Sequence, residues 1–187
     1  MHWQEDHHHH QADQPALIAE RDLETYIPPE LLGADDELRP VDWNTLPADE
    51  AEGEWRDLNE WVDWIRKSHG LPANVIAPLW HRHDEMVWEL SAQHLSFRAS
   101  YHRDAQPTAP AAWRRDFWDA QQRLRQMVAA CGTRIDRDRP TRVTAWPGEP
   151  TIPTTAERVI TNRAEDFEQF VAEDIRQRRE REARAAA

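Results

Sequence analysis

The fold is decided by residues 54–69, EWRDLNEWVDWIRKSH, in which large apolar side chains recur at intervals of three and four positions. This spacing places them on one face of an α-helix. The stripe consists of Trp55, Leu58, Trp61, Val62 and Ile65. Gly70 follows, and glycine commonly ends a helix because it adopts left-handed backbone angles without steric cost. We therefore predict an amphipathic helix over residues 54–69 that must bury its apolar face against other elements.

Two further segments have the same helical periodicity. One covers residues 84–103, and its packing seam is formed by Val87, Leu90, His94, Phe97 and Tyr101. The other covers residues 110–131, and its stripe is formed by Trp113, Phe117, Ala120, Leu124, Met127 and Cys131. The connector between the first two helices, residues 71–80, contains prolines that disfavour helix in the residue before them. The sequence predicts an all-α protein, a small three-helix bundle over residues 54–132.

The segments on either side of this Trp-rich helical core are more polar. Residues 1–53 carry 14 acidic and two basic side chains, a net charge of 2 − 14 = −12 that equals the net charge of the whole chain. This composition and five prolines predict an acidic, mostly disordered N-terminal arm. Residues 133–153 are predicted to be a linker. Residues 154–187 are predicted to be a C-terminal amphipathic helix and tail, with an apolar stripe of Phe167, Phe170, Val171 and Ile175.

Several properties of the whole chain limit the class of protein. The single cysteine, Cys131, cannot form an internal disulfide, which suits a reducing compartment. No apolar run approaches the roughly 20 residues of a membrane-spanning helix, and the N-terminus lacks a secretory signal. We therefore expect a cytoplasmic protein without membrane association. The tract His7–His10 is assigned no function, and the sequence does not decide whether it is native.

The densest group of reactive side chains lies in residues 80–85, WHRHDE. One interpretation is a metal site that combines His81 and His83 with further ligands chosen from His94, His102, Asp84 and Glu85. The HExxH helical spacing is absent, and His94 belongs to a packing seam. The dipeptide His83-Asp84 also occurs in metal-dependent phosphohydrolases, but these need a larger helical scaffold. We favour a structural role for Trp80, Arg82 and His83 and predict neither a metal nor a cofactor.

Catalytic groups are otherwise scarce. The chain has five glycines, none of them clustered, which excludes the usual phosphate-binding loops. Cys131 has no catalytic-triad pattern near it. We predict that the protein is not an enzyme.

The unusual feature of the composition is its tryptophan content, ten residues in 187. Seven of them fall within the predicted core, and a bundle of this size cannot easily enclose seven indoles. Exposed tryptophan and arginine side chains are common anchors at protein interfaces. The candidate partner-binding residues are Trp61, Trp64, Trp80, Arg82, His83 and Trp88. We predict a non-enzymatic protein-interaction module, although surplus indoles that merely cap the bundle fit the sequence equally well.

Arginines in the third helix and the linker suggest an alternative, a nucleic-acid-binding module. The basic strip runs from Arg114 to Arg142, and its candidate residues are Arg114, Arg115, Arg123, Arg134, Arg137 and Arg139. Trp113 or Trp118 would then stack on bases. Asp136 and Asp138 alternate with the arginines and weaken the local field, which favours a solvated mixed-charge linker. A third interpretation makes the acidic arm a mimic of DNA that occupies the nucleic-acid site of a partner protein.

Three stretches of the chain resemble a known family. They are residues 58–62 (LNEWV), residues 79–83 (LWHRH) leading into residues 87–90 (VWEL), and Ala112-Trp113 leading into Arg123-Leu124. The resemblance is to a family of uncharacterised actinobacterial proteins, a domain of unknown function with a Trp-x-Arg-His motif that often occurs on plasmids, integrative elements and phages. Relatives have Cys-Trp-x-Arg-His followed by Pro, whereas Leu79 and Asp84 stand at those positions here. The missing cysteine argues against a thiol-based metal or redox role. The resemblance implies a mobile genetic element of an actinobacterium, which the single lysine beside many arginines also suits, and it implies no reaction.

Overall fold

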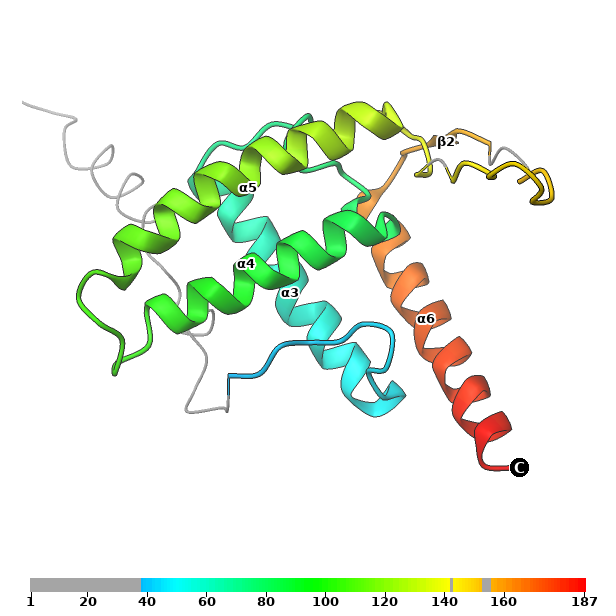
Figure 1. The fold of residues 1–187 in the computed structure, drawn as a ribbon, viewed down its shortest axis with the longest axis horizontal. Helices are drawn as coiled ribbons and strands as arrows, with labels where there is room; N and C mark the ends of the chain where they lie inside the picture. Colours follow the sequence, from blue (N-terminus) through cyan, green and yellow to red (C-terminus); the bar gives the residue numbers. More distant parts are fainter. Residues whose placement is uncertain (1–37, 142, 153–155) are drawn as a thin grey trace, which may run out of the picture.

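The computed structural model describes residues 38–141, 143–152 and 156–187 (Figure 1). Within these residues the chain forms four α-helices and a small two-stranded sheet. The helices are α3 (Ala48–Ser68), α4 (Asp84–Ser100), α5 (Ala109–Cys131) and α6 (Arg163–Ala185), and a 3₁₀ turn, η1 (Trp80–Arg82), precedes α4. The sheet pairs β1 (Arg137–Asp138) with β2 (Arg158–Val159) in antiparallel orientation. The protein is mostly helical, and its sheet ties the predicted linker to the segment before α6.

The helices pack as two connected pairs. α4 and α5 lie side by side as an antiparallel hairpin, α3 crosses behind α4, and α6 lies along α3 (Figure 1). Each helix contributes its apolar stripe to one core. The connector after α3 is part of this core, since Val75, Ile76 and Ala77 are buried.

The predicted packing faces of the hairpin are confirmed. α4 buries Val87, Leu90 and Phe97, and it ends at Ser100 rather than residue 103. α5 buries most of its predicted stripe, namely Trp113, Phe117, Ala120, Leu124 and Cys131. The rings of Trp113 and Phe117 stack with centroids 5.1 Å apart. Gly132 ends α5 with φ 75°, a left-handed conformation that glycine adopts without steric cost.

The first helix begins earlier than predicted. α3 starts at Ala48 rather than at residue 54, with Pro47 in an extended conformation at its N-cap. Proline is tolerated at a helix start because its missing N–H would have no intrahelical acceptor there. Asp49 and Glu50 lie in the first turn, where acidic side chains stabilise the positive end of the helix dipole. Ala51 is buried, so its small side chain lets this added turn approach the core.

The predicted boundary of the N-terminal arm is therefore wrong. Residues 38–47, which we call the strap, run across the core, and the strap buries Trp43 and Leu46. The ring of Trp43 packs on Trp55 with centroids 4.2 Å apart. The two prolines of the strap and the acidic composition of residues 1–53 suggested disorder, whereas the packing partners of the strap lie in distant parts of the chain. The rest of the predicted arm, residues 1–37, lies outside the described residues.

The prediction of a three-helix bundle is also wrong, because α6 is a fourth core helix. Its predicted stripe is confirmed, since Phe167, Val171 and Ile175 are buried, and α6 packs against α3. Arg178, beyond the predicted stripe, is also buried, and its guanidinium satisfies backbone carbonyls of the strap.

Arg178 connects α6 to the strap by hydrogen bonds. Its Nη1 donates to the carbonyl of Leu46 at 2.7 Å, and its Nη2 donates to the carbonyl of Trp43 at 3.0 Å. Its Nε donates to Asp174 at 2.7 Å, and the same carboxylate oxygen accepts from the indole of Trp55 at 2.9 Å. Buried carbonyls without a donor are costly, so this one side chain holds the strap in place.

We expect Arg178→Ala to destabilise the protein by about 3 kcal/mol, because it leaves two buried carbonyls without their donor and the partly buried carboxylate of Asp174 without its cation. Urea unfolding, followed by tryptophan fluorescence, measures the change. Arg179→Ala, on the exposed face of the same helix, is the matched control and should change stability by less than about 0.5 kcal/mol. Equal losses for both variants would contradict the clamping role of Arg178.

Candidate functional site

The segment from Trp80 to Glu85 lies where α3, α4 and α6 approach one another. Leu79 and Trp80 are buried, and backbone bonds from Arg82 N to Leu79 O and from His83 N to Trp80 O close the tight turn η1. His83 then adopts an extended conformation as the N-cap residue of α4. This geometry sends the side chains of His81, Arg82 and His83 to different partners.

His81 and Arg82 share one carboxylate, that of Asp166 in the first turn of α6. The Nε2 of His81 lies 2.9 Å from Asp166 Oδ1. Arg82 donates to both oxygens of this carboxylate, from Nε at 2.7 Å and from Nη2 at 3.0 Å. Arg158 of β2 also donates to Asp166, at 3.2 Å. Asp166 is therefore the point at which η1, β2 and α6 meet.

Burial determines the charge state of this contact. It lowers the pKa of His81 from 6.5 to about 4, although the hydrogen bond to Asp166 acts in the opposite direction. Burial tends to raise the pKa of Asp166, but hydrogen bonds from Arg82 and His81 outweigh it and hold this pKa below its ordinary 3.8. At neutral pH an uncharged His81 ring therefore donates to an ionised Asp166, and Arg82 balances the charge.

The side chain of His83 does not contact Asp166 and instead forms hydrogen bonds with the predicted linker. Its ring is fully buried; Nε2 lies 2.8 Å from Asp138 Oδ1 and Nδ1 lies 3.1 Å from Thr141 Oγ1. Thr133 donates to the same oxygen of Asp138 at 3.2 Å, and Thr141 donates to Glu85 at 2.8 Å. An Asp–His–Thr series also occurs in catalytic relays. Here the histidine is enclosed, so the series acts as a polar connection between the N-terminus of α4 and the strand β1.

The structure does not bring the proposed metal ligands together. His81 and His83 engage different aspartates, and His94 stacks on Trp61 with ring centroids 5.3 Å apart. Among the described residues, no group of three or more His, Cys, Asp or Glu side chains could hold a metal ion.

Several predicted partner-binding residues are inaccessible. Trp61 and Trp80 are buried in the core, and His83 is enclosed by its polar partners. Arg82 is partly exposed but is bound to Asp166. Trp64 is half-buried against Phe97 and His69, which leaves Trp88 as the one exposed tryptophan of the predicted set, with 40% exposure. The prediction is thus wrong for Trp61, Trp80 and His83, whose partners lie within the chain itself.

Two tryptophans outside the predicted set are more exposed. Trp118 on α5 is 62% exposed, and Trp146 in the linker is 74% exposed. The sequence contained a signal for Trp118, because it lies off the apolar stripe of the third helix and next to Phe117, which belongs to that stripe. Trp146 is the large apolar residue of a polar segment and has no neighbouring stripe to join.

Three of the six arginines of the basic strip are paired with carboxylates in the structure. Arg123 forms two hydrogen bonds with Glu89, at 2.9 and 2.7 Å. Arg137 and Arg139 share Glu157, at 2.9 and 2.6 Å. Arg114, Arg115 and Arg134 are exposed and form no ion pair with any described residue. Asp138 is buried, so it does not alternate with the arginines on the surface as the sequence suggested.

Comparisons with protein-family models, with curated proteins and with solved structures find no match to this chain. The resemblance to an actinobacterial family therefore stays a prediction. No helix within the described part of the chain is long and apolar enough to cross a membrane.

We expect acidification from pH 6.5 to pH 4 to destabilise the fold through His81. The unfolded chain binds a proton at this ring near pH 6.5 and the folded chain only near its pKa of about 4, so the unfolded state takes up more protons in this window and stability falls as the pH falls. The loss from His81 reaches at most about 3 kcal/mol. Urea unfolding of the wild type and of His81→Gln at pH 7, 5.5 and 4.5 measures it, because glutamine can donate to Asp166 but does not titrate. Parallel pH dependences of the two proteins would rule out His81 as the group responsible.

We expect Asp138→Ala to destabilise the protein by about 3 kcal/mol, because removing one partner of a buried polar pair leaves the other unsatisfied. Asp136→Ala is the control, since the Asp136 side chain lies two residues away and is 66% exposed. Chemical unfolding of both variants gives the comparison. A loss in Asp138→Ala no larger than that in Asp136→Ala would show that the His83 contact does not hold the linker.

Proposed function

We propose that the chain is a non-enzymatic helical protein-interaction module and that the outer face of α5 around Trp118 anchors the partner. The observation that carries this proposal is that some tryptophans are buried in the core and others are exposed. The core encloses Trp43, Trp55, Trp61, Trp80 and Trp113, whereas Trp88, Trp118 and Trp146 are exposed. Packing within the chain therefore does not explain all of the tryptophans. Trp118 stands outside this core on a regular helix, and a rigid aromatic side chain loses little entropy when it enters a partner's pocket.

The neighbours of Trp118 indicate the chemistry of the partner. Arg114 and Arg115 precede it by four and three positions, and Arg125 follows it by seven, so helical periodicity places them on the same side of α5. None of these arginines forms an ion pair with a described residue. A cationic stripe around an apolar anchor is complementary to an acidic protein segment that offers a pocket for the indole.

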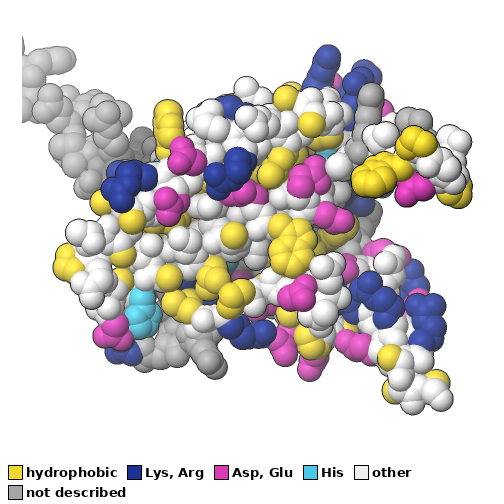
Figure 2. Space-filling view, in the orientation of Figure 1, with side chains coloured by type: hydrophobic (Ala, Val, Ile, Leu, Met, Phe, Trp, Pro, Cys, Tyr) yellow, Lys and Arg dark blue, Asp and Glu magenta, His cyan; other side chains and the backbone are white. Residues whose placement is uncertain are grey.

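Nucleic acid is the alternative ligand of this stripe, because arginine and tryptophan side chains also bind single-stranded nucleic acid. Two observations favour protein. Acidic and basic side chains are interspersed over the visible face of α4 and α5, with no extended field of one sign (Figure 2). Arg123, Arg137 and Arg139 are paired with carboxylates and would have to be released to contact phosphates.

The proposed DNA mimicry concerns the acidic residues before the strap. Residues 1–37 carry ten acidic side chains and one basic side chain. A deletion that tests their role must end at residue 37, since removal of residues 38–53 would take Trp43 and Leu46 out of the core. The cytoplasmic location, and the actinobacterial mobile element that the resemblance implies, remain part of this proposal.

Trp118→Ala tests the proposed anchor. Full-length tagged protein is used to capture partners from a nuclease-treated lysate of the source organism, and a protein captured by the wild type but not by the variant is then purified. Calorimetry should show binding weakened at least about 30-fold in Trp118→Ala, the effect of a hot-spot residue. Arg115→Glu should also weaken binding, because the partner is acidic. The loss of affinity should be larger at low salt than at high salt, because salt screens the repulsion.

Asp119→Ala, an exposed neighbour on the same helix, is the matched control and should bind the acidic partner at least as tightly as the wild type. An unchanged set of captured proteins in Trp118→Ala would contradict the proposal. Capture from an untreated lysate that is absent from the nuclease-treated lysate would instead favour the nucleic-acid alternative.

A further inference from the structure

Exposed apolar side chains are concentrated between α5 and α6. Seven large apolar side chains of the described residues are exposed, and five of them lie in this linker and its sheet, namely Ile135, Val143, Trp146, Ile152 and Val159. The remaining two are Trp88 and Trp118. A local concentration of exposed apolar surface marks an interaction site, because contact of such groups with water is unfavourable.

Trp146 is the largest of these side chains in the linker, and a tight turn holds it. The N–H of Glu149 donates to the carbonyl of Trp146 at 2.9 Å, and the N–H of Trp146 donates to the carboxylate of Glu149 at 2.8 Å. Pro147 and Gly148 occupy the central positions of the turn, and Gly148 has φ 96°, which glycine adopts without steric cost. The turn belongs to a segment that extends away from the four helices (Figure 1). It therefore presents the exposed indole in a fixed position.

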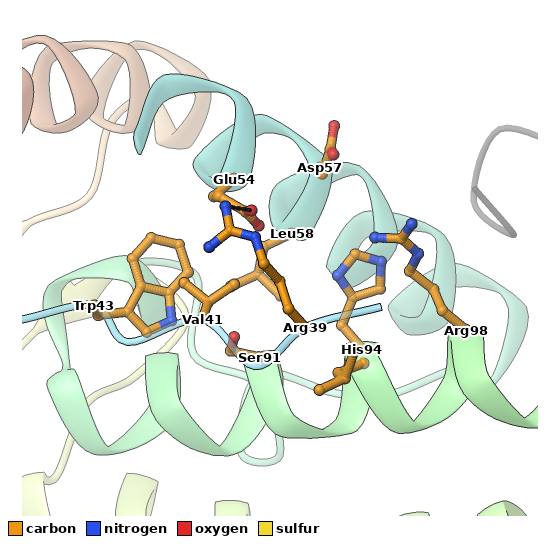
Figure 3. A pocket seen from close by; sticks show the side chains of 10 residues that line it. Arg39, Val41, Trp43, Glu54, Asp57, Leu58, Ser91, His94 and Arg98 are labelled. Atoms are coloured by element: carbon orange, nitrogen blue, oxygen red, sulfur yellow. Dashed lines mark ion pairs between the residues drawn. The ribbon is translucent and has the colours of Figure 1, made fainter. Parts of the chain in front are cut away.

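Two cavities of similar size differ in their linings. One, of about 330 Å³, lies between the strap, α3 and α4, and the charged side chains of Arg39, Glu54 and Arg98 line it (Figure 3). The other, of about 380 Å³, which we call the connector cavity, lies between α3, the connector and the start of α6. Its lining is mainly apolar and includes Val62, Leu71, Pro72, Ile76, Pro78 and Trp80. An indole gains more free energy from burial in the connector cavity, because it desolvates fewer charged groups there.

The connector cavity also carries a net positive charge. Arg66 and Arg163 line it beside a single carboxylate, that of Asp63, which is already paired with Arg66 at 2.9 Å. Arg163 forms no ion pair with a described residue, and its hydrogen bonds go to uncharged oxygens of Pro78 and Asn59. Burial lowers the pKa of Arg163, since no adjacent carboxylate offsets the loss of hydration. Its guanidinium is therefore the cation available to an acidic group that enters the cavity.

The chain itself contains a segment that is complementary to this cavity. Residues 143–152, which we call the Trp146 loop, contain one charged side chain, that of Glu149. The loop combines an exposed indole with a carboxylate, and the cavity combines an apolar lining with the guanidinium of Arg163. Trp146 does not fill the cavity of its own chain, because it is exposed and does not line that cavity. A second copy of the chain can supply the same loop.

We propose that two copies of the chain form a two-fold dimer in which Trp146 of each copy enters the connector cavity of the other, with Glu149 against Arg163. Ile135 near the base of the linker lines the cavity, so the cavity adjoins the segment from which the loop projects. This placement lets the two copies exchange their loops reciprocally across a two-fold axis. The contact is then made twice, and the assembly closes at two copies. The outer face of α5 takes no part, so this interface is separate from the proposed partner surface around Trp118.

The acidity of the chain does not prevent such a contact. Residues 1–37 carry ten acidic side chains and one basic side chain, a net charge of 1 − 10 = −9. Residues 38–187 therefore hold only −12 + 9 = −3 of the net charge of the whole chain. Repulsion between exposed charges is screened beyond about 8 Å at physiological salt.

Sedimentation equilibrium of the full-length protein tests the proposal, at about 1 to about 500 μM protein and about 0.15 M salt. The wild type should show a monomer–dimer equilibrium without larger species. Trp146→Ala should weaken dimerisation at least about 30-fold, the effect of a hot-spot residue. Trp118→Ala, the same substitution at an exposed tryptophan outside the interface, is the matched control and should dimerise as the wild type does.

Glu149→Gln tests the charge complementarity. Glutamine keeps an oxygen that can accept from the N–H of Trp146, but it removes the negative charge that faces Arg163. Dimerisation should weaken, and the ratio of the dissociation constants of the variant and the wild type should be larger at low salt than at high salt.

Two complementary variants separate dimerisation from folding. Ala73 lines the connector cavity, so Ala73→Phe fills the cavity and leaves Trp146 in place. Neither Ala73→Phe nor Trp146→Ala should dimerise like the wild type. A mixture of the two keeps one intact contact in each heterodimer, an indole from the first variant and a cavity from the second. Energy transfer between the labelled variants should therefore show that the mixture associates more tightly than either variant alone.

A wild type that stays monomeric over the whole concentration range would overturn the proposal. Dimerisation of Trp146→Ala at the wild-type level would place the interface elsewhere. A mixture that associates no better than its components would show that the indole and the cavity are not partners. Equal losses in Trp118→Ala and Trp146→Ala would also contradict an interface that excludes α5.

Discussion

The carboxylate of Asp166 is the contact on which the rest of the structure depends. It accepts hydrogen bonds from His81, Arg82 and Arg158, which belong to the turn before α4 and to the strand β2. Because Asp166 lies in the first turn of α6, these bonds fix the start of that helix against the α3–α4 connection. Once the start is fixed, the apolar stripe of α6 lies along α3, and Arg178 lies within reach of the strap. A local polar contact thus positions a helix that closes the core.

The helical stripes could be predicted from the sequence because they are local patterns. A residue at Trp113 and another at Phe117 lie on the same face of a helix whatever the rest of the chain does. The polar contacts could not be predicted in this way. His83 meets Asp138 across 55 residues, and Arg178 meets Trp43 across 135, so no spacing rule connects them. The same limit explains why the strap was assigned to a disordered arm and α6 to a helix outside the core, since both bury their residues against distant parts of the chain.

Helical geometry also determines whether a given indole is buried or exposed. Trp61 lies on the stripe of α3 and is enclosed, while Trp64 lies three positions on and packs at the edge of the core against Phe97. On α5 the adjacent residues Phe117 and Trp118 differ by one step of about 100° around the helix axis, which is enough to bury one and expose the other. The sequence indicated that some indoles must be exposed. Which ones they are depends on the side from which α3 and α4 approach, and that is a property of the assembled fold.

A cavity between the strap, α3 and α4 and the outer face of α5 lie on different sides of α4. Ser91, His94 and Arg98 line the cavity, whereas Leu90, Gln93 and Phe97 are buried, with Trp113 of α5 donating from its indole to the carbonyl of Gln93 at 3.4 Å. Coupling between the two surfaces would require α4 to move against a close-packed aromatic cluster, in which Phe97 and Trp113 lie 5.0 Å apart. Packed interiors of this kind resist gradual deformation, and the described residues offer no second arrangement of α4 that a ligand could favour. The face that surrounds Trp118 is therefore presented by a helix whose position against α4 is fixed by close packing.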